Sequence, residues 1–192
     1  MELSPRLYHL FVRPKWFPKL CVRKVLKNKF DFEGKTVLDF GSGIGTNSSM
    51  FSPDTYIGLD CDKKRVDYAQ RLYPKHRFGT LNGKELPLQE DSVDYILIFS
   101  VMHHIPLEEW ERYLSEFHRV LKPYGRVIVV EPCFIINCYL SNLFMRVMDR
   151  GNYIQESNRY IEQFGGNRFK VEEPKVYRQM FLYHKLFFSA SP

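Results

Sequence analysis

The sequence is poor in the features that mark disulfide-rich, zinc-binding or membrane-spanning proteins. Its 192 residues include only four cysteines, at positions 21, 61, 133 and 138, and none forms a Cys-x-x-Cys pair. A disulfide framework or a zinc site is therefore not expected, and a reducing cytoplasm is the default compartment. No run of about 18 apolar residues occurs, so we expect no transmembrane helix. The opening residues lack an apolar core, so we expect no signal peptide.

Positive charge is concentrated at one end of the chain. Residues 1–30 contain eight Lys or Arg and one acid, which gives this segment +7 of a total net charge of +6. We expect a basic N-terminal arm or helix over 1–30, with helical spacing at about 18–28, before a single domain over 31–192. Such an arm attracts the phosphates of lipid or nucleic acid. A solvated helix face is the alternative interpretation.

Strand-like and helix-like patterns alternate along the remaining sequence. Short apolar runs predict strands, and apolar residues at helical spacing predict the helices between them. The expected strands are 35–40, 55–59, 77–80, 93–99, 126–130, 170–178 and 183–189, and the expected helices are 63–73, 107–121, 135–148 and 159–164. This alternation predicts an α/β fold with a parallel, doubly wound sheet. Ligands of such sheets bind beyond the carboxyl ends of the strands.

The first expected strand ends in a glycine-rich turn, Asp-Phe-Gly-Ser-Gly-Ile-Gly at 39–45. Glycines allow a tight turn and a close approach of the backbone to a ligand. The spacing is G-x-G-x-G, which differs from the G-x-G-x-x-G of dinucleotide-binding enzymes. Asp39 precedes the glycines, where its carboxylate is placed to receive an ammonium group directly or through water.

The second expected strand ends in another acid, Asp60. A carboxylate at this position can accept hydrogen bonds from both hydroxyls of a ribose. The alternative is that Asp60 caps the next helix, but Asp62 is a strong rival for that role. Two acids and a glycine turn at neighbouring strand ends therefore predict a nucleoside-type cofactor.

Three further blocks follow in order, at 82–94, 100–105 and 121–132. With the glycine turn they resemble class I S-adenosylmethionine-dependent methyltransferases, closely over 35–131 and loosely in the last two strands. The resemblance implies a Rossmann-like, mostly parallel seven-stranded sheet with helices on both faces and an antiparallel last strand. It also implies S-adenosylmethionine as cofactor, S-adenosylhomocysteine as product, and methyl transfer as the reaction.

The resemblance assigns a set of cofactor-binding residues. The glycine turn would pack on the methionine portion of the cofactor, and Asp60 would hold its ribose. The adenosine would be flanked by residues 61, 82–83 and 99–100. The whole set is Asp39, Gly41, Ser42, Gly43, Gly45, Asp60, Cys61, Asn82, Gly83, Phe99 and Ser100. Asn82 departs from the family, which usually carries Asp there, but an amide oxygen can still accept from the adenine amino group.

Two histidines, His103 and His104, follow the fourth expected strand and are candidate general bases. An unperturbed imidazole titrates near neutrality, and a base helps only if the acceptor must lose a proton. The alternative is that histidines stand here in similar sequences whatever the substrate. The sequence therefore nominates these two residues without choosing between the interpretations.

The methyl acceptor is less constrained by the sequence. The fourth strand does not end in the Asn/Asp-Pro-Pro-aromatic pattern of enzymes that methylate nucleobase amines, and no Asp/His cluster suggests a metal ion. Residues 132–166 are apolar at helical spacing, which favours core packing or a substrate-side insertion. We expect a small, lipophilic acceptor, with peripheral membrane contact through the N-terminal arm. A methyltransferase of RNA or protein and a cofactor-binding module without turnover stay open, with nucleic acid less favoured.

Overall fold

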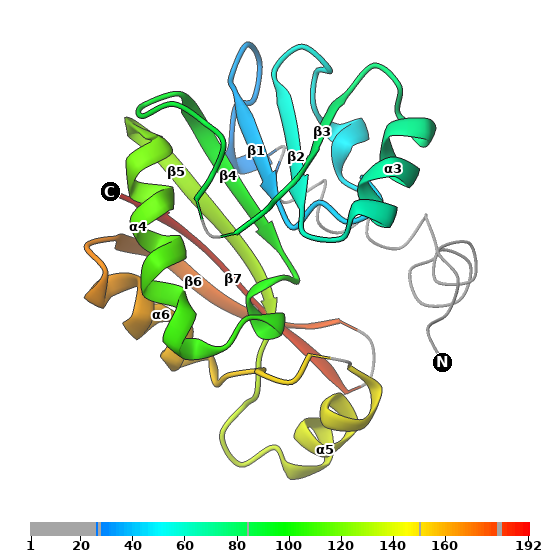
Figure 1. Ribbon diagram of the computed structural model, residues 1–192. Helices are drawn as coiled ribbons and strands as arrows, with labels where there is room; N and C mark the ends of the chain where they lie inside the picture. The colour runs from blue at the N-terminus through cyan, green and yellow to red at the C-terminus, as the bar shows by residue number, and fades with distance from the viewer. Residues whose placement is uncertain (1–25, 27, 84, 150, 180–181) are drawn as a thin grey trace. The chain divides into compact units, whose positions relative to one another are not determined.

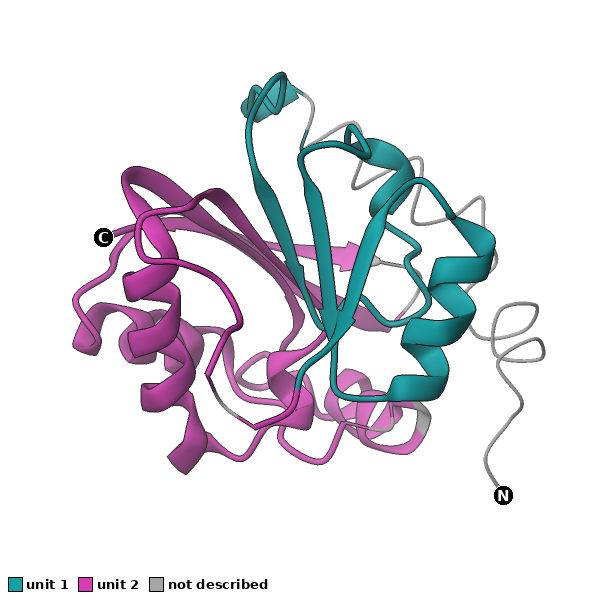
Figure 2. Ribbon diagram, turned by 45° about the horizontal axis from the view of Figure 1, so that its top comes forward, with its two compact units in different colours: residues 1–81 teal, residues 82–192 magenta. Residues whose placement is uncertain are grey.

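A computed structural model describes residues 26, 28–83, 85–149, 151–179 and 182–192 of the chain. The basic arm predicted at 1–30, with its helix at 18–28, therefore lies almost entirely outside the described residues. The backbone divides into two compact units, Met1–Leu81 and Asn82–Pro192 (Figure 2).

Unit 1 contains three parallel strands in the order β3-β2-β1 (Figure 1). The strands are β1 (Val37–Phe40), β2 (Tyr56–Asp60) and β3 (Arg77–Thr80). All four residues of β1 are buried, as expected of a short apolar strand that is covered on both faces. Only a three-residue 3-10 helix, η2 (Ser48–Met50), lies between β1 and β2, whereas the ten-residue helix α3 (Lys63–Leu72) joins β2 to β3.

Asp62 directly precedes helix α3, and its side chain accepts hydrogen bonds from the backbone N–H groups of Lys64 and Arg65. These bonds satisfy two of the donors that a helix N-terminus otherwise leaves without a partner. Asp62 is therefore the N-cap, and the alternative interpretation of Asp60 as the helix cap is wrong.

Unit 2 contains four strands in the order β4-β5-β7-β6. They are β4 (Val93–Phe99), β5 (Leu121–Pro132), β6 (Lys170–Gln179) and β7 (Tyr183–Ser191). The strand β4 is parallel to β5, and β7 is antiparallel to both of its neighbours, which confirms the predicted antiparallel last strand. The helical segments are η3 (Met102–His104), η4 (Leu107–Glu109), α4 (Trp110–Val120), α5 (Tyr139–Met148) and α6 (Ser157–Gly166).

The core of unit 2 joins α4 and α6 to the sheet. Figure 1 shows these two helices side by side, and the ring centroids of Trp110 and Tyr160 lie 5.2 Å apart between them. The indole Nε1 of Trp110 donates to the carbonyl of Ile105 at 3.0 Å, so this buried polar group has a partner. Phe164 of α6 meets Phe188 of β7 edge to face, with the ring centroids 5.0 Å apart. Aromatic packing therefore fixes α6 against both α4 and β7.

The helix expected at 135–148 begins only at Tyr139, so the prediction is wrong over its first four residues. The side chain of Asn142 explains the difference, because its amide donates to the carbonyl of Ile135 at 2.8 Å and accepts from the N–H of Ile135 at 3.1 Å. Asn137 also has a left-handed φ of 65°. Local side-chain hydrogen bonds thus hold the start of this segment as a loop.

None of the described helices has the length and apolar character that crossing a bilayer requires.

Truncation of Trp110 should strongly destabilise the protein. Its side chain is fully buried, so Trp110→Ala removes packing and leaves a cavity, and we expect a loss of about 3–5 kcal/mol in the free energy of unfolding. The matched control is Tyr124→Ala, because Tyr124 is 97% exposed and its removal should change stability by less than about 0.5 kcal/mol. Urea denaturation measures both, and equal losses would contradict this account of the core.

Candidate functional site

The glycine turn of unit 1 follows β1 directly. Gly41, Gly43 and Gly45 have φ values of 70°, 56° and 74°, a region that residues with a side chain rarely adopt. The N–H of Ser42 donates to the carbonyl of Leu59 at 2.9 Å, which holds the turn against the end of β2. The alternating glycines are therefore required by the backbone path itself.

The Asp60 carboxylate lies against this turn. Its Oδ2 accepts from the N–H of Gly43 at 2.8 Å, and its Oδ1 accepts from the N–H of Asp62 at 2.9 Å. A carboxylate offers about four acceptor positions, so roughly two remain for donors outside the protein chain. The Asp60 side chain thus fixes the turn and keeps the capacity to bind a pair of hydroxyl groups.

The hydroxyl of Ser42 is the clearest sign of a ligand in this unit. Its Oγ is buried and has no hydrogen-bond partner among the described residues. Leaving a buried hydroxyl unsatisfied costs about 1–3 kcal/mol, so such atoms usually serve a ligand or a water molecule. Because Ser42 lies inside the glycine turn, the residues present fit a polar ligand bound at this turn.

Asp39 is buried at the end of β1 and is held by two neighbours of the same unit. Its Oδ2 accepts from the hydroxyl of Tyr56 at 2.7 Å, and its Oδ1 accepts from the side-chain amide of Asn47 at 3.4 Å. Burial and the adjacent Asp39 raise the pKa of Tyr56 well above its usual value, so the phenol stays a donor. Sequence reasoning missed Tyr56, whose only signal is a tyrosine at the start of an apolar strand. The ammonium contact of Asp39 stays a prediction.

The remaining predicted contacts of the adenosine lie at two loops and at the end of β4. Cys61 is exposed in unit 1, and Asn82 and Gly83 are exposed in unit 2. Gly83 has a φ of 84°, which only glycine adopts easily. Phe99, by contrast, is buried as the last residue of β4. The side chains of Cys61 and Asn82 are exposed and therefore accessible to a ligand, and their roles stay predictions.

Ser100 follows β4 with a left-handed φ of 56°, an uncommon conformation for a residue with a side chain. Its N–H donates to the carbonyl of Val130 at 2.8 Å, and its hydroxyl accepts from the Lys185 ammonium at 3.0 Å. The same ammonium lies 4.4 Å from the ring centroid of Phe99. Sequence reasoning missed Lys185, because nothing in the pattern of β7 distinguishes an inward lysine from an exposed one.

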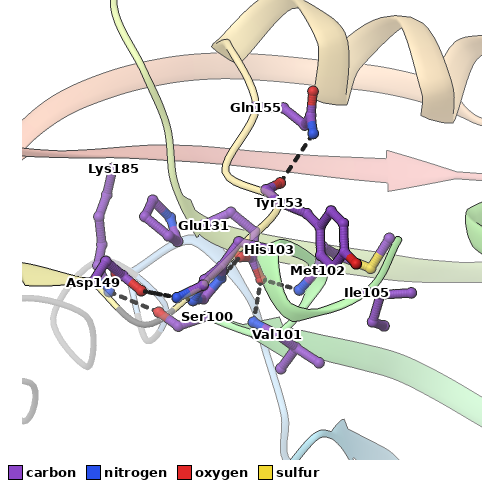
Figure 3. A network of polar contacts seen from close by, with 12 residues as sticks. Ser100, Val101, Met102, His103, Ile105, Glu131, Asp149, Tyr153, Gln155 and Lys185 are labelled. Carbon is purple, nitrogen blue, oxygen red and sulfur yellow. Dashed lines mark hydrogen bonds and ion pairs between the residues drawn. The ribbon is translucent and has the colours of Figure 1, made fainter. Parts of the chain in front are cut away.

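A buried glutamate organises the segment after β4 (Figure 3). Glu131, near the end of β5, accepts from the N–H groups of Val101 and Met102 through Oε1, at 2.6 and 3.0 Å. Its Oε2 lies 2.7 Å from Nδ1 of His103. One fully buried carboxylate therefore positions both the backbone and the first of the two candidate histidines.

His103 is held between two carboxylates. Its Nε2 lies 3.4 Å from Asp149, opposite the bond to Glu131. Burial alone lowers the pKa of His103, but the hydrogen bonds to Asp149 and Glu131 outweigh it and raise the pKa to about 9. Burial in turn raises the pKa of Asp149, and its bonds to His103 outweigh that effect and hold it well below the usual range. The imidazole is therefore a cation at neutral pH with both N–H groups engaged.

The loop after α5 closes over the His103 ring. A Cβ added at Gly151 would lie 1.9 Å from Cδ2 of His103, so only glycine fits there. The N–H of Tyr153 donates to the carbonyl of His103 at 3.0 Å. His104, in contrast, is exposed, with its ring centroid 4.1 Å from that of His103. The two adjacent histidines thus occupy very different environments.

Several known methyltransferases are similar in sequence to this chain. Residues 38–129 match the sequence model of a methyltransferase domain family. A probable S-adenosylmethionine-dependent methyltransferase of Mycolicibacterium smegmatis is 34% identical over 103 residues, which cover 52% of this chain and 38% of the relative. A fatty-acid O-methyltransferase of the same organism is 32% identical over 104 residues, which cover 50% and 36%. A demethylmenaquinone methyltransferase of Oceanobacillus iheyensis is 32% identical over 108 residues, which cover 51% and 44%. The matches therefore span less than half the length of each relative.

Solved structures show the same fold. An S-adenosylmethionine-dependent methyltransferase from Aquifex aeolicus aligns over 100% of both chains with a TM-score of 0.73 at 19% identity. Another from Archaeoglobus fulgidus covers 96% of this chain and 97% of that chain, with a TM-score of 0.74 at 14% identity. The predicted Rossmann-like sheet of seven mostly parallel strands is therefore confirmed.

The fold, the glycine turn and the acid after β2 define a Rossmann-like methyltransferase domain. The match of residues 38–129 to the methyltransferase domain model, together with the relatives and the solved structures, supports the class I S-adenosylmethionine-dependent methyltransferase superfamily that the sequence motifs predict. The cofactor of that superfamily is S-adenosylmethionine.

The ion pairs of His103 should make stability depend on pH. Because the pKa rises from 6.5 to about 9 on folding, the protonated ring stabilises the protein fully below about pH 6.5, and this contribution is lost as pH rises through 9. The stabilisation by the protonated His103 ring corresponds to roughly 3 kcal/mol in the free energy of unfolding. We expect the free energy of unfolding of the native chain to fall by about that much relative to His103→Gln between pH 6.5 and 10.

Urea titrations at several pH values measure this difference. His104→Gln is the matched control, because the exposed ring of His104 should leave the pH profile close to that of the native chain. Parallel profiles for the native chain and His103→Gln would contradict the proposed charge state.

Proposed function

We propose that this protein transfers a methyl group from S-adenosylmethionine to a small, lipophilic acceptor. The observation that carries the proposal is the turn at 41–45, where the Ser42 hydroxyl has no partner among the described residues and Asp60 keeps acceptor capacity. The match to the methyltransferase domain model and the similar relatives support the same cofactor. The domain is proposed to cover 31–192, after a basic arm at 1–30, in a cytoplasmic protein.

The proposed cofactor-binding set follows the motifs of the superfamily. In unit 1, the glycine turn would hold the methionine portion with Ser42 and Asp39, Asp60 would accept the ribose hydroxyls, and Cys61 would flank the adenine. In unit 2, Asn82 and Gly83 would meet the adenine edge, with Phe99 and Ser100 beside the adenosine.

The cofactor supplies an electrophilic sulfonium methyl group, so the protein has mainly to orient the reactants and exclude water. The Glu131 carboxylate contributes by fixing the backbone of Val101 and Met102, and hence the path of the chain after β4. The left-handed φ of Ser100 is consistent with a constrained backbone at a functional position. These groups position the site and need not touch the reacting atoms.

A lipophilic acceptor is supported by two observations. Two of the relatives bear names that specify a fatty acid or demethylmenaquinone as substrate. The segment 132–166, which we propose as the substrate-side insertion, carries large apolar side chains that are not buried in the core. The exposed set is Ile136, Tyr139, Leu140, Leu143, Phe144, Val147 and Tyr153.

The geometry favours different roles for the two candidate bases. A base must be neutral to accept a proton, and the pKa of about 9 leaves His103 protonated at neutral pH. We therefore propose His103 as a positioning residue. The exposed His104 remains the candidate base, for acceptors that must lose a proton.

Asp60→Ala should weaken the binding of S-adenosylhomocysteine at least tenfold, because it removes the proposed acceptors of the ribose hydroxyls. Isothermal titration calorimetry with S-adenosylmethionine and S-adenosylhomocysteine measures the affinity. Asp67→Ala, which removes an exposed carboxylate that pairs with Lys63 on α3, is the matched control and should bind as the native chain does. No heat with either ligand on the native chain would overturn the proposed function.

His104→Ala should separate two kinds of acceptor. A fatty-acid carboxylate is already ionised at neutral pH, so its methylation should change less than about twofold. A quinol hydroxyl must lose a proton, so its methylation should slow by about a hundredfold. Transfer of a radioactive methyl group from S-adenosylmethionine to each acceptor measures both rates. If neither acceptor gives a methylated product, the proposed lipophilic class of acceptor is contradicted.

A further inference from the structure

Helix α5 presents large apolar side chains to solvent. Tyr139 is 80% exposed, Leu140 is 77% exposed and Val147 is 74% exposed, and Leu143 is exposed between them. Residues three or four apart along a helix share one side, so these four form a continuous row, with the partly exposed Phe144 at its edge. We call these five residues the α5 stripe.

The opposite side of α5 is the one that faces the protein. Ser141 and Met145 are buried there. The hydroxyl of Ser141 lies 2.7 Å from the carbonyl of Leu182 and 2.8 Å from Nδ1 of His184, which joins α5 to the start of β7. An ordinary surface helix buries its apolar side and exposes its polar side, whereas α5 exposes most of its large apolar side chains and buries Ser141 beside Met145. The α5 stripe is thus too large and too contiguous to be scattered surface residues.

The one charged residue of helix α5 is positive. Residues 132–148 contain no acid and one base, Arg146, whose exposed guanidinium lies 5.1 Å from the ring centroid of Phe134. The helix that carries the stripe therefore has a cation and no anion, which is complementary to an anionic surface.

From this arrangement we propose that the α5 stripe docks onto an anionic lipid bilayer. The leucines and valine of the stripe enter the boundary between headgroups and acyl chains, and Tyr139 lies at headgroup level with its hydroxyl toward water. Arg146, on the same helix, meets the lipid phosphates. Residues 1–30 carry a charge of +7, which adds to the attraction of the chain for anionic lipid.

A bilayer fits the α5 stripe better than a second copy of the chain does. A two-fold contact would pair the stripe with itself and bring the Arg146 residues of both copies into one interface. The segment 132–148 offers no acid to compensate that repulsion, whereas anionic headgroups do. The inference does not rest on the proposed function, because lipid binding and cofactor binding are measured separately.

Flotation of the full chain with vesicles tests the inference. We expect binding to vesicles of phosphatidylglycerol mixed with phosphatidylcholine, and weaker binding to phosphatidylcholine alone. The double variant Leu140→Ser, Leu143→Ser should weaken binding to the mixed vesicles at least tenfold, because it removes two inserted side chains. Arg146→Gln should weaken it about fivefold, and added salt should reduce that difference.

The matched control is Tyr124→Ser, since Tyr124 is a large exposed side chain outside the α5 stripe and its loss should leave binding unchanged. Calorimetry with S-adenosylhomocysteine on the double variant should match the native chain, which shows that the variant is folded. Three results would overturn the inference: no binding to the mixed vesicles, equal binding by the double variant, or a lipid-free dimer in sedimentation equilibrium that the double variant abolishes. The last result would assign the stripe to a second copy.

Discussion

The hydrogen bonds of the buried Glu131 carboxylate hold the segment after β4 in place, and the rest of the polar network in unit 2 depends on them. The carboxylate accepts from two backbone N–H groups through one oxygen and pairs with His103 through the other. A buried carboxylate without partners would be costly, so the backbone of 101–102 and the charge of the imidazole are held in place by the need to satisfy it. Asp149 pairs with the second N–H of His103, which joins the loop after α5 to the same network.

Unit 1 shows the same principle on a smaller scale. The Asp60 carboxylate is tied to Gly43 of the glycine turn, and Asp39 is tied to Tyr56. Each of these buried acids at a strand end thus has hydrogen-bond partners in its own unit, and these partners offset the cost of removing the carboxylate from water.

The fold was largely predictable, because short apolar runs, helix-breaking residues and a capping acid indicate the same boundaries for the strands and helices. The strands 77–80 and 93–99 end where their apolar pattern ends, and Asp62 caps α3 as expected. The start of α5 was not predictable, because the bonds of Asn142 to Ile135 override helical spacing. The prediction that the apolar residues of this segment pack in the core is wrong for most of α5, because the α5 stripe is exposed and helical spacing alone does not set which side of a helix faces the sheet.

The sequence by itself determined the superfamily, the order of the elements and the set of residues proposed to hold the cofactor. These properties follow from short-range patterns, namely glycines in a turn, acids after strands and apolar periodicity. Only the tertiary structure decided which of two adjacent histidines is buried between Glu131 and Asp149 and which side of α5 meets solvent. Both depend on contacts between residues 28 to 46 positions apart in the chain. At such separations burial and pairing, rather than local sequence, set the charge and exposure of a side chain.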